Sequence, residues 1–334
     1  MRFSTGLAAA LALSFGMVAG VHAQQFTMKI SSPTTNDITT EWMRVMKAGI
    51  EGRAGGRIKV EGYPANQLGQ LPRAVEGVAL GTIEVTISAI GFYVGLEPRF
   101  EALEVPGLFE DMSHALKVLA DPEVKKRLAT FGATKGIEPL WMGVQAPIAL
   151  VSHKPVRTLA DLKGQKLRTP GPTPIHMDPL RRLGAAPLGM ALGEALPAMQ
   201  NRTIDGAIAT INVFNVFKYY DVAKSVTTMP QAFLVFAGAV NRAWMKSLGP
   251  ELEAIVREEA AKAESINTSF GLADFERASK SWEANGGQFL TLSAAEAARF
   301  IEEVSAAVAP ILARQPRVKE DYDALLAAAK RLRQ

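Results

Sequence analysis

The chain has 334 residues, no cysteine and a formal net charge of +4 at pH 7. Without cysteine it can form no disulfide, no thiol nucleophile, no cysteine-based zinc site and no lipid-modified N-terminal cysteine. The charges are interspersed and form no basic stripe, so the composition speaks against a nucleic-acid partner.

The N-terminus has the pattern of a secretory signal peptide. Met1-Arg2 is short and basic, residues 7–21 are apolar and small, and Val21-His22-Ala23 resembles a signal-peptidase site. We predict a signal peptide over 1–23, cleavage after Ala23 and a periplasmic location. The alternative is an uncleaved N-terminal anchor. No later apolar run reaches the length that a membrane span requires.

Strands alternate with helices through the first half of the chain. In order, the pattern predicts a strand at 26–30, a helix at 41–54, a strand at 57–61, a helix at 71–80, a strand at 83–89, helices at 114–119 and 122–131, and a long apolar stretch at 137–151. This alternation predicts a parallel sheet and α/β architecture.

A second α/β series begins near Lys154. In order, it predicts a strand at 165–168, a helix at 174–183, a strand at 187–188, a helix at 193–201, a strand at 205–209, an apolar segment at 233–240 that crosses back, a strand at 288–292 and helices from 294 onward. A chain of this length favours two lobes. We predict lobe I over 24–145 with 234–273 crossing back, and lobe II over 146–233 with 274–334 packing on it.

A long helical segment follows Pro250. From there to Ala284 the chain contains one glycine, Gly271, and no further proline. Asn285-Gly286-Gly287 then has the composition of a helix C-cap. The pattern predicts one continuous helix of roughly 50 Å, longer than a lobe is wide, that braces both lobes. The alternative is two helices broken near Gly271.

Arg168 is the strongest candidate for a binding residue. It lies at the carboxyl end of a predicted strand, where open α/β sheets place their ligands. Its guanidinium keeps its charge and offers a flat fork of donors that matches a carboxylate. The Gly171–Thr173 backbone could add N–H donors beside it. The alternatives are an ordinary surface ion pair for Arg168 and a plain turn after it.

Catalytic and cofactor motifs are weak in this sequence. There is no G-x-S-x-G, no Walker A loop and no G-x-G-x-x-G. His114, His153 and His176 each lack a second metal ligand at helical or hairpin spacing. We therefore expect no catalytic residue, no metal and no cofactor.

Several short motifs resemble, in order and spacing, the solute-binding subunit of tripartite ATP-independent periplasmic (TRAP) transporters. They lie at 63–69 (YPANQLG), 76–82, 104–109 (EVPGLF), 159–170 (ending DLKGQKLRTP), 183–187 (LGAAP), 193–196, 205–206 (DG) and 241–244 (NRAW). The resemblance implies a two-lobed periplasmic binding protein with a cleft between the lobes. It further implies a small organic carboxylate ligand, membrane permease partners and no covalent chemistry, and we expect a monomer.

The resemblance also assigns site residues. Arg168 falls on the family's arginine that clamps the substrate carboxylate, and Gly171 falls in the loop beside it. Ser88 and Phe92 follow the third strand, where the first lobe contributes pocket walls. Leu192 falls where an apolar or aromatic residue often lines the pocket.

Two departures from the family pattern limit this transfer. Ala209-Thr210 stands where many members carry a ligand-contacting asparagine, so Asn212 is the nearest amide. Gln145 stands near the position of a second arginine in some members. A second cationic clamp is therefore not expected, which speaks against sialic-acid-like and densely charged ligands. Phe214 is a further candidate for an apolar wall.

Other functions remain open from the sequence. The chain could be the binding protein of another transporter or sensor class, or a secreted enzyme that acts on carboxylates. If Arg168 is not the clamp, the anion site would have to lie at Arg99, Lys154 or Arg242.

Overall fold

One mixed sheet runs through the molecule. The computed structural model describes residues 26–333 and contains nine strands there, in the order β2-β1-β3-β8-β4-β7-β5-β6, with β9 beside β8. The strands are β1 (Phe26–Ser31), β2 (Ile58–Tyr63), β3 (Val85–Ala89), β4 (Ile137–Ser152), β5 (Lys166–Thr169), β6 (Ala186–Gly189), β7 (Gly206–Thr210), β8 (Ser225–Asn241) and β9 (Gln288–Leu290). The α/β fold class is confirmed.

Two long strands join the halves of this sheet. β8 pairs with β3 in one half, β4 pairs with β7 in the other, and β4 and β8 pair with each other along their length. All three pairings are antiparallel, so the prediction of a parallel sheet is wrong for the centre. β8 runs back along β4, and two strands that run in opposite directions can pair without a crossover helix between them. The alternation of strands and helices in the sequence does not show the direction in which a strand runs.

Helices cover both halves. The helical segments before β5 are α1 (Ile38–Arg53), α2 (Leu71–Leu80), η1 (Ile90–Phe92), η2 (Pro98–Leu103), α3 (Met112–Ala120), α4 (Pro122–Leu128), η3 (Ala133–Lys135) and η4 (Leu159–Leu162). Those between β5 and β8 are α5 (Pro174–Arg182), α6 (Leu192–Gln200), α7 (Ile211–Val216) and η5 (Tyr219–Asp221). Those after β8 are α8 (Arg242–Ser247), α9 (Gly249–Ala263), α10 (Ile266–Ser269), α11 (Gly271–Ala284), α12 (Ala294–Arg314) and α13 (Pro316–Arg331).

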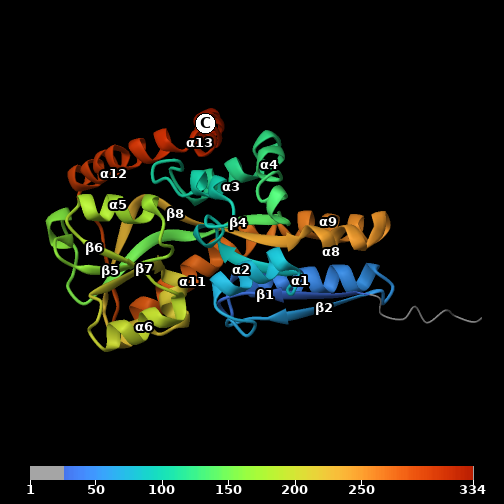
Figure 1. Ribbon diagram of the computed structural model, residues 1–334. Coiled ribbons are helices and arrows are strands. Elements are labelled where there is room, and N and C mark those ends of the chain that lie inside the picture. The colour runs from blue at the N-terminus through green and yellow to red at the C-terminus, as the bar shows by residue number, and fades with distance from the viewer. Residues whose placement is uncertain (1–25, 334) are drawn as a thin grey trace, which may run out of the picture.

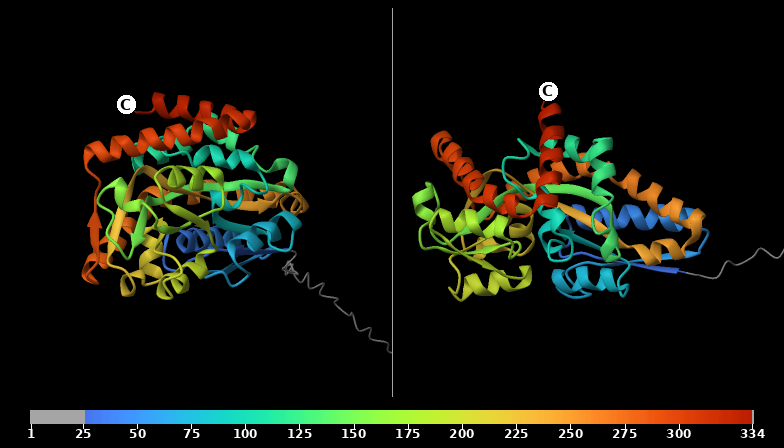
Figure 2. Two further views of the ribbon diagram at one scale, coloured as in Figure 1. Left: turned by 60° about the vertical axis from the view of Figure 1, so that its left-hand side comes forward. Right: turned by 45° about the horizontal axis from the view of Figure 1, so that its top comes forward.

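We call β1–β3 with the helices packed on them the first lobe, and β5–β7 with theirs the second lobe. Figure 1 and the right view of Figure 2 show the lobes side by side, linked by β4 and β8. α12 lies over α5, whereas α13 packs on η2, α3 and α4 of the first lobe (Figure 1). The residue limits drawn for the lobes from the sequence stay a prediction.

The predicted helix over 250–284 is wrong in its continuity. It is divided into α9, α10 and α11, with breaks at Glu264-Ser265 and at Phe270. At the first break the Ser265 hydroxyl donates to the Lys262 carbonyl at 2.9 Å. Such back-bonding competes with the regular helical pattern and bends helices. The backbone nevertheless stays right-handed helical at all three break residues, so the segment still runs from the first lobe to the second.

Each lobe contains a cluster of buried aromatic side chains. In the first lobe Trp42 stacks on Trp141 with ring centroids 4.9 Å apart, and Trp141 meets Phe236 edge-on at 4.6 Å. In the second lobe, Phe214 packs against Tyr219 and Trp282. Burying aromatic rings of this size supplies a large part of the hydrophobic stabilisation of each lobe.

The predicted signal peptide and its cleavage site lie outside the described residues. Along residues 26–333, none of the helices combines the length and the apolar composition needed to span a membrane.

Candidate functional site

A small cavity lies between the two lobes at the carboxyl end of β5, and we call it the Arg168 cavity. Its volume is about 50 Å³. The first lobe lines it with the β1–α1 loop, the start of α2, the end of β3 and Phe92 of η1. The second lobe contributes residues of β5, α6, β7 and α7, and the linking strands add Gln145, Leu234 and Phe236. An occupant would therefore touch both lobes at once.

Arg168 is the only arginine or lysine among the residues that line this cavity. Its side chain is buried, with Nε donating to the Met190 carbonyl at 3.0 Å and Nη1 donating to the Ile208 carbonyl at 2.9 Å. β6 and β7 flank β5 on either side, and the two acceptors are Met190, which follows β6, and Ile208, in the middle of β7. The guanidinium is thereby fixed in one orientation.

No carboxylate among residues 26–333 pairs with Arg168, whose two hydrogen bonds go to backbone carbonyls. Burial lowers the pKa of Arg168 to about 10, because the charged form loses its hydration. A buried charge without a counter-ion is costly. The cavity therefore carries a positive charge that an anion entering it would neutralise.

A polar network lies on the first-lobe side of the cavity. Asp37, the N-cap of α1, accepts hydrogen bonds from Thr34 at 2.5 Å, Thr39 at 2.7 Å and the Gln145 amide at 3.0 Å. Gln145 in turn accepts from the Thr210 hydroxyl at 2.8 Å, and Thr210 caps α7 of the second lobe. Burial raises the pKa of Asp37, although the hydrogen bonds from Thr34 and Thr39 oppose the shift. The donors and acceptors of the network are thus engaged with one another.

The remaining walls are mostly apolar. Ile87, Leu71 and Phe92 approach from the first lobe, and Leu192 and Val213 from the second. Ser88 also lines the cavity, and its hydroxyl already donates to the Ala89 carbonyl at 3.1 Å. The cavity thus combines one fixed cation with a largely hydrophobic surface.

Comparison with known proteins identifies the family. Residues 31–315 match the family model described as bacterial extracellular solute-binding protein, family 7. The chain belongs to this family. It is 31% identical over 263 residues, 78% of this chain and 75% of the relative, to the 2,3-diketo-L-gulonate-binding periplasmic protein YiaO of Escherichia coli K12.

Solved structures agree on the fold. A TRAP periplasmic solute-binding protein from Desulfovibrio salexigens, with bound orotic acid, superposes with a TM-score of 0.86 at 22% identity, over 92% of this chain and 99% of that one. One from Haemophilus influenzae, with bound L-gulonate, gives 0.85 at 20% identity, over 91% and 99%. The TRAP resemblance seen in the sequence is confirmed, and the family places the protein outside the cytoplasm.

Five of the eight residues that the sequence singled out for this solute-binding protein meet at one place. They line the Arg168 cavity and are Ser88, Phe92, Gln145, Arg168 and Leu192. Because they come from β3, η1, β4, β5 and α6, only the tertiary fold brings them together. Their role in binding stays a prediction.

The other three lie elsewhere. Asn212 is buried on α7, where its amide donates to Asp274 of α11 at 2.7 Å. Phe214 is fully buried in the aromatic cluster of the second lobe. Gly171 lies against the first lobe, where a Cβ placed on it would be 3.3 Å from the Gly91 carbonyl oxygen. These positions make helix packing and lobe contact the structural roles of the three residues.

The sequence analysis missed the β1–α1 loop. Thr34 of this loop and Thr39 in the first turn of α1 line the cavity, and both donate hydrogen bonds to Asp37. A local signal was present, because Asp37 and Thr40 have the spacing of a capping box. A capping box predicts where a helix begins, but it does not predict that the N-terminus of that helix borders a cavity.

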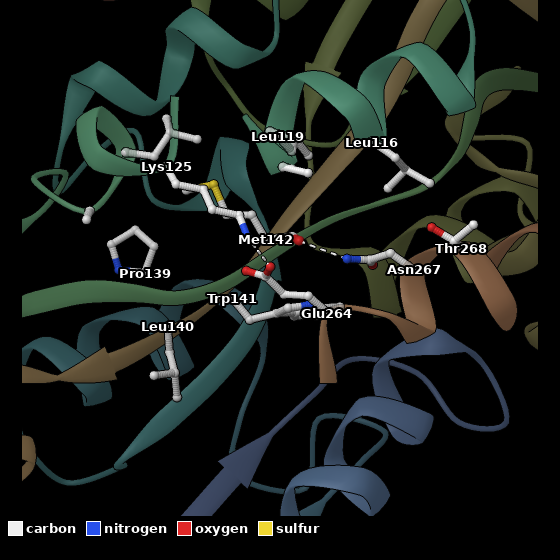
Figure 3. Close-up of a pocket in the computed structure, with 13 residues that line it drawn as sticks. Leu116, Leu119, Lys125, Pro139, Leu140, Trp141, Met142, Glu264, Asn267 and Thr268 are labelled. Carbon is white, nitrogen blue, oxygen red and sulfur yellow. Dashed lines mark hydrogen bonds and ion pairs between the residues drawn. The ribbon is translucent and has the colours of Figure 1, made fainter. Parts of the chain in front are cut away.

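A larger hollow lies away from Arg168. It has a volume of about 250 Å³ and is bordered by α3, α4, β4 and the break between α9 and α10 (Figure 3). The side chains of Lys125 and Glu264 meet across it as an ion pair, and the Asn267 amide donates to the Met142 carbonyl at 3.1 Å (Figure 3). Because its charges are already paired, this hollow lacks the uncompensated cation that distinguishes the Arg168 cavity. Within 26–333 the structure also has no cluster of three or more His, Cys, Asp or Glu side chains suited to a metal.

Proposed function

We propose that this protein captures a small organic carboxylate in the Arg168 cavity and hands it, unchanged, to the membrane permease of a TRAP transporter. The observation that carries the proposal is the buried guanidinium of Arg168, which has no carboxylate partner in the described chain. A carboxylate fits its bidentate fork and restores charge balance in a desolvated site. Lobe movement around the site would bury the ligand and alter the surface offered to the permease.

We further propose that the body of the ligand is mainly apolar. The walls that face Arg168 are aliphatic and aromatic, and the polar groups of Asp37 and Gln145 are occupied by each other and by neighbouring hydroxyls. A polyhydroxylated acid would leave hydroxyls without partners in such a site, which costs affinity. YiaO is described as binding 2,3-diketo-L-gulonate, a sugar-acid derivative, so we expect the ligand of this chain to share the carboxylate and to differ in the rest of the molecule.

A thermal-shift screen tests the ligand class, because a ligand that binds only the folded state raises the melting temperature. The panel contains a branched aliphatic 2-oxo acid, succinate, orotate, D-glucuronate and L-gulonate, each with its neutral amide or ester. We expect the largest shift from the aliphatic acid and none from the neutral analogues. A larger shift from the sugar acids would refute the apolar body, and equal shifts from acids and amides would refute the clamp.

Arg168→Ala should weaken binding of the best acid about a hundredfold or more. Leaving a buried carboxylate unpaired costs roughly 3–5 kcal/mol, and about 1.4 kcal/mol corresponds to a tenfold change in affinity. Arg168→Lys should recover only part of the affinity, because an ammonium cannot form the bidentate pair. Arg182→Ala, which removes an exposed arginine of the nearby α5, is the matched control. Calorimetry that finds Arg168→Ala within a few-fold of the parent would contradict the assignment.

Two further features belong to this proposal. We infer that the mature protein begins near Gln24 and acts as a monomer without turning over its ligand. Intact-mass measurement of periplasmic protein, light scattering, and recovery of unchanged ligand after long incubation test these statements in turn. Retention of Met1 would contradict cleavage near Gln24. A stable dimer would contradict the monomer, and a new product would contradict binding without turnover.

A further inference from the structure

The two lobes touch beside the Arg168 cavity. On one side Gly91 of η1 meets Gly171, as the 3.3 Å approach described above shows. On another side α6 meets α2, since a Cβ on Gly193 would lie 2.8 Å from Nε2 of Gln70. The structure therefore has the lobes in contact around the cavity, and any group that bridges them at these points holds the closed arrangement.

One ionisable pair bridges the lobes directly behind the Gly91–Gly171 contact. Nε2 of His176, in the first turn of α5, lies 3.3 Å from Oε1 of Glu104, which follows η2 in the first lobe. The two side chains are 11% and 6% exposed. A Cβ on Gly91 would lie 2.8 Å from Oε1 of Glu104 and 3.0 Å from Cε1 of His176, so the glycine leaves the space that the pair occupies.

We propose that the Glu104–His176 ion pair is a latch that holds the lobes closed over the Arg168 cavity, and that His176 is a positioning residue for solute capture. The latch requires the protonated imidazolium, because only that form carries the charge that pairs with the Glu104 carboxylate. This inference rests on the proposed closure of the lobes and holds for whichever acid is bound.

The charges around His176 favour the protonated form. Burial alone would lower the pKa of His176, but the nearby carboxylates of Glu104 and Glu101 outweigh it and raise that pKa, with Arg168 opposing them. Glu101 accepts a hydrogen bond from Gln315 at 2.8 Å. The charged and titratable groups that face His176 are therefore Glu104 and Glu101 from the first lobe and Arg168 from β5.

Within the pair itself, no other hydrogen bond replaces the ionic attraction if the proton is lost. The second oxygen of Glu104 and Nδ1 of His176 are buried and have no hydrogen-bond partner in the described chain. A neutral imidazole would leave Glu104 as a buried charge without a cation, which favours separation of the lobes. The sign follows directly: since the pKa of His176 is raised, the latch is present at lower pH and is lost as the pH rises through that pKa.

The first test is an NMR titration of the histidine rings in residues 24–334 without ligand. The sequence holds four histidines, of which His22 lies in the predicted signal peptide, so three remain to be assigned. We expect the pKa of His176 to lie above the usual value of about 6.5 and Glu104→Gln to lower it, because the substitution removes the neighbouring carboxylate. Glu303→Gln is the control, because Glu303 of α12 is the half-buried partner of Arg182, which lies on the same helix as His176, and the change does not touch His176.

The second test measures lobe separation directly. Because the chain has no cysteine, spin labels can be placed through Glu76→Cys on α2 and Gln200→Cys on α6, both exposed, without removing native thiols. We expect the short inter-label distance to be more populated at pH 6 than at pH 9. In Glu104→Gln and in His176→Gln this pH dependence should disappear.

The titration, the distance measurement and the binding assay test the Glu104–His176 latch and the Arg168 carboxylate clamp independently. A His176 pKa that Glu104→Gln leaves unchanged, or an inter-label distance independent of pH in the parent, overturns the latch. Loss of acid binding in Arg168→Ala while the pH-dependent distance persists supports both proposals. Unchanged acid binding in Arg168→Ala with an intact latch counts against the carboxylate clamp alone.

Discussion

The burial of the Arg168 guanidinium lowers the stability of the unliganded fold. Its pKa is lowered to about 10 from an ordinary value of 12.5, which corresponds to roughly 3 kcal/mol at about 1.4 kcal/mol per unit. Because the pKa in the folded state lies below that of the unfolded chain, this penalty applies at pH 7 and fades as the pH rises through about 10. The two hydrogen bonds to Met190 and Ile208 offset part of it.

Arg168→Met should therefore be at least as stable as the parent when no ligand is present, and we expect a gain of about 1 kcal/mol. The substitution removes the buried charge but leaves two carbonyls without donors, at about 1 kcal/mol each. Urea unfolding at pH 7 measures this difference. A loss of more than about 2 kcal/mol would show that the guanidinium stabilises the fold itself.

At the scale of elements, the helical segment α9–α11 is attached to the central strand β4 at α10, the short helix between its two breaks. Asn267 of α10 is buried and donates from its amide to the carbonyl of Met142 on β4 at 3.1 Å. Its oxygen lies so close to Gly143 that a Cβ there would be 2.2 Å away. The broken segment is thus fastened to the central strand at the place where its hydrogen-bonding pattern changes.

Asn267→Ala should lower the free energy of unfolding by about 1–2 kcal/mol. The change leaves the Met142 carbonyl unpaired and creates a small space beside β4. Thr268→Ala alters the neighbouring, exposed side chain and should stay within about 0.5 kcal/mol of the parent. Equal effects of the two substitutions in chemical denaturation would mean that the amide link to β4 contributes nothing.

At the scale of the whole molecule, α13 attaches the C-terminus to the first lobe. Asp321 of α13 is fully buried and accepts from Nε of Arg99 at 2.6 Å and from Nη1 of Arg127 at 2.7 Å. Arg99 is the second residue of η2, and Arg127 belongs to α4. Arg99 also lies over the ring of Phe131 at 4.3 Å. Arg99, a candidate anion site if Arg168 were not the clamp, is therefore already paired.

Asp321→Asn should destabilise the protein by about 3 kcal/mol, since removing one partner from a buried ion pair strands the other charges. The partial exposure of Arg99 and Arg127 keeps the loss near the low end of the range for such pairs. Asp323→Asn breaks the exposed pair with Lys319 on the same helix and should cost less than about 0.5 kcal/mol. Thermal unfolding of the two variants should therefore give clearly different midpoints.

Local patterns in the sequence were sufficient to predict most of the helices and strands. Apolar periodicity located α2 at 71–80, and Pro122 and Pro174 marked the starts of α4 and α5. These features depend on interactions between residues a few positions apart, which a linear reading contains. The same holds for Arg168, because its place at the end of a short strand before Pro170 is a local property.

Pairing and packing were decided only in three dimensions. The antiparallel centre of the sheet arises because β8 returns along β4, and the break in the long helix sits where Asn267 meets that strand. The local sequence does not predict that Asn212 contacts Asp274 or that Phe214 contacts Trp282, because each partner lies more than 60 residues away in the chain. The sequence by itself determined most of the elements and the cationic residue. Only the tertiary structure decided which side chains surround that residue and which bridge the lobes beside it, because those contacts join segments that are distant in the chain.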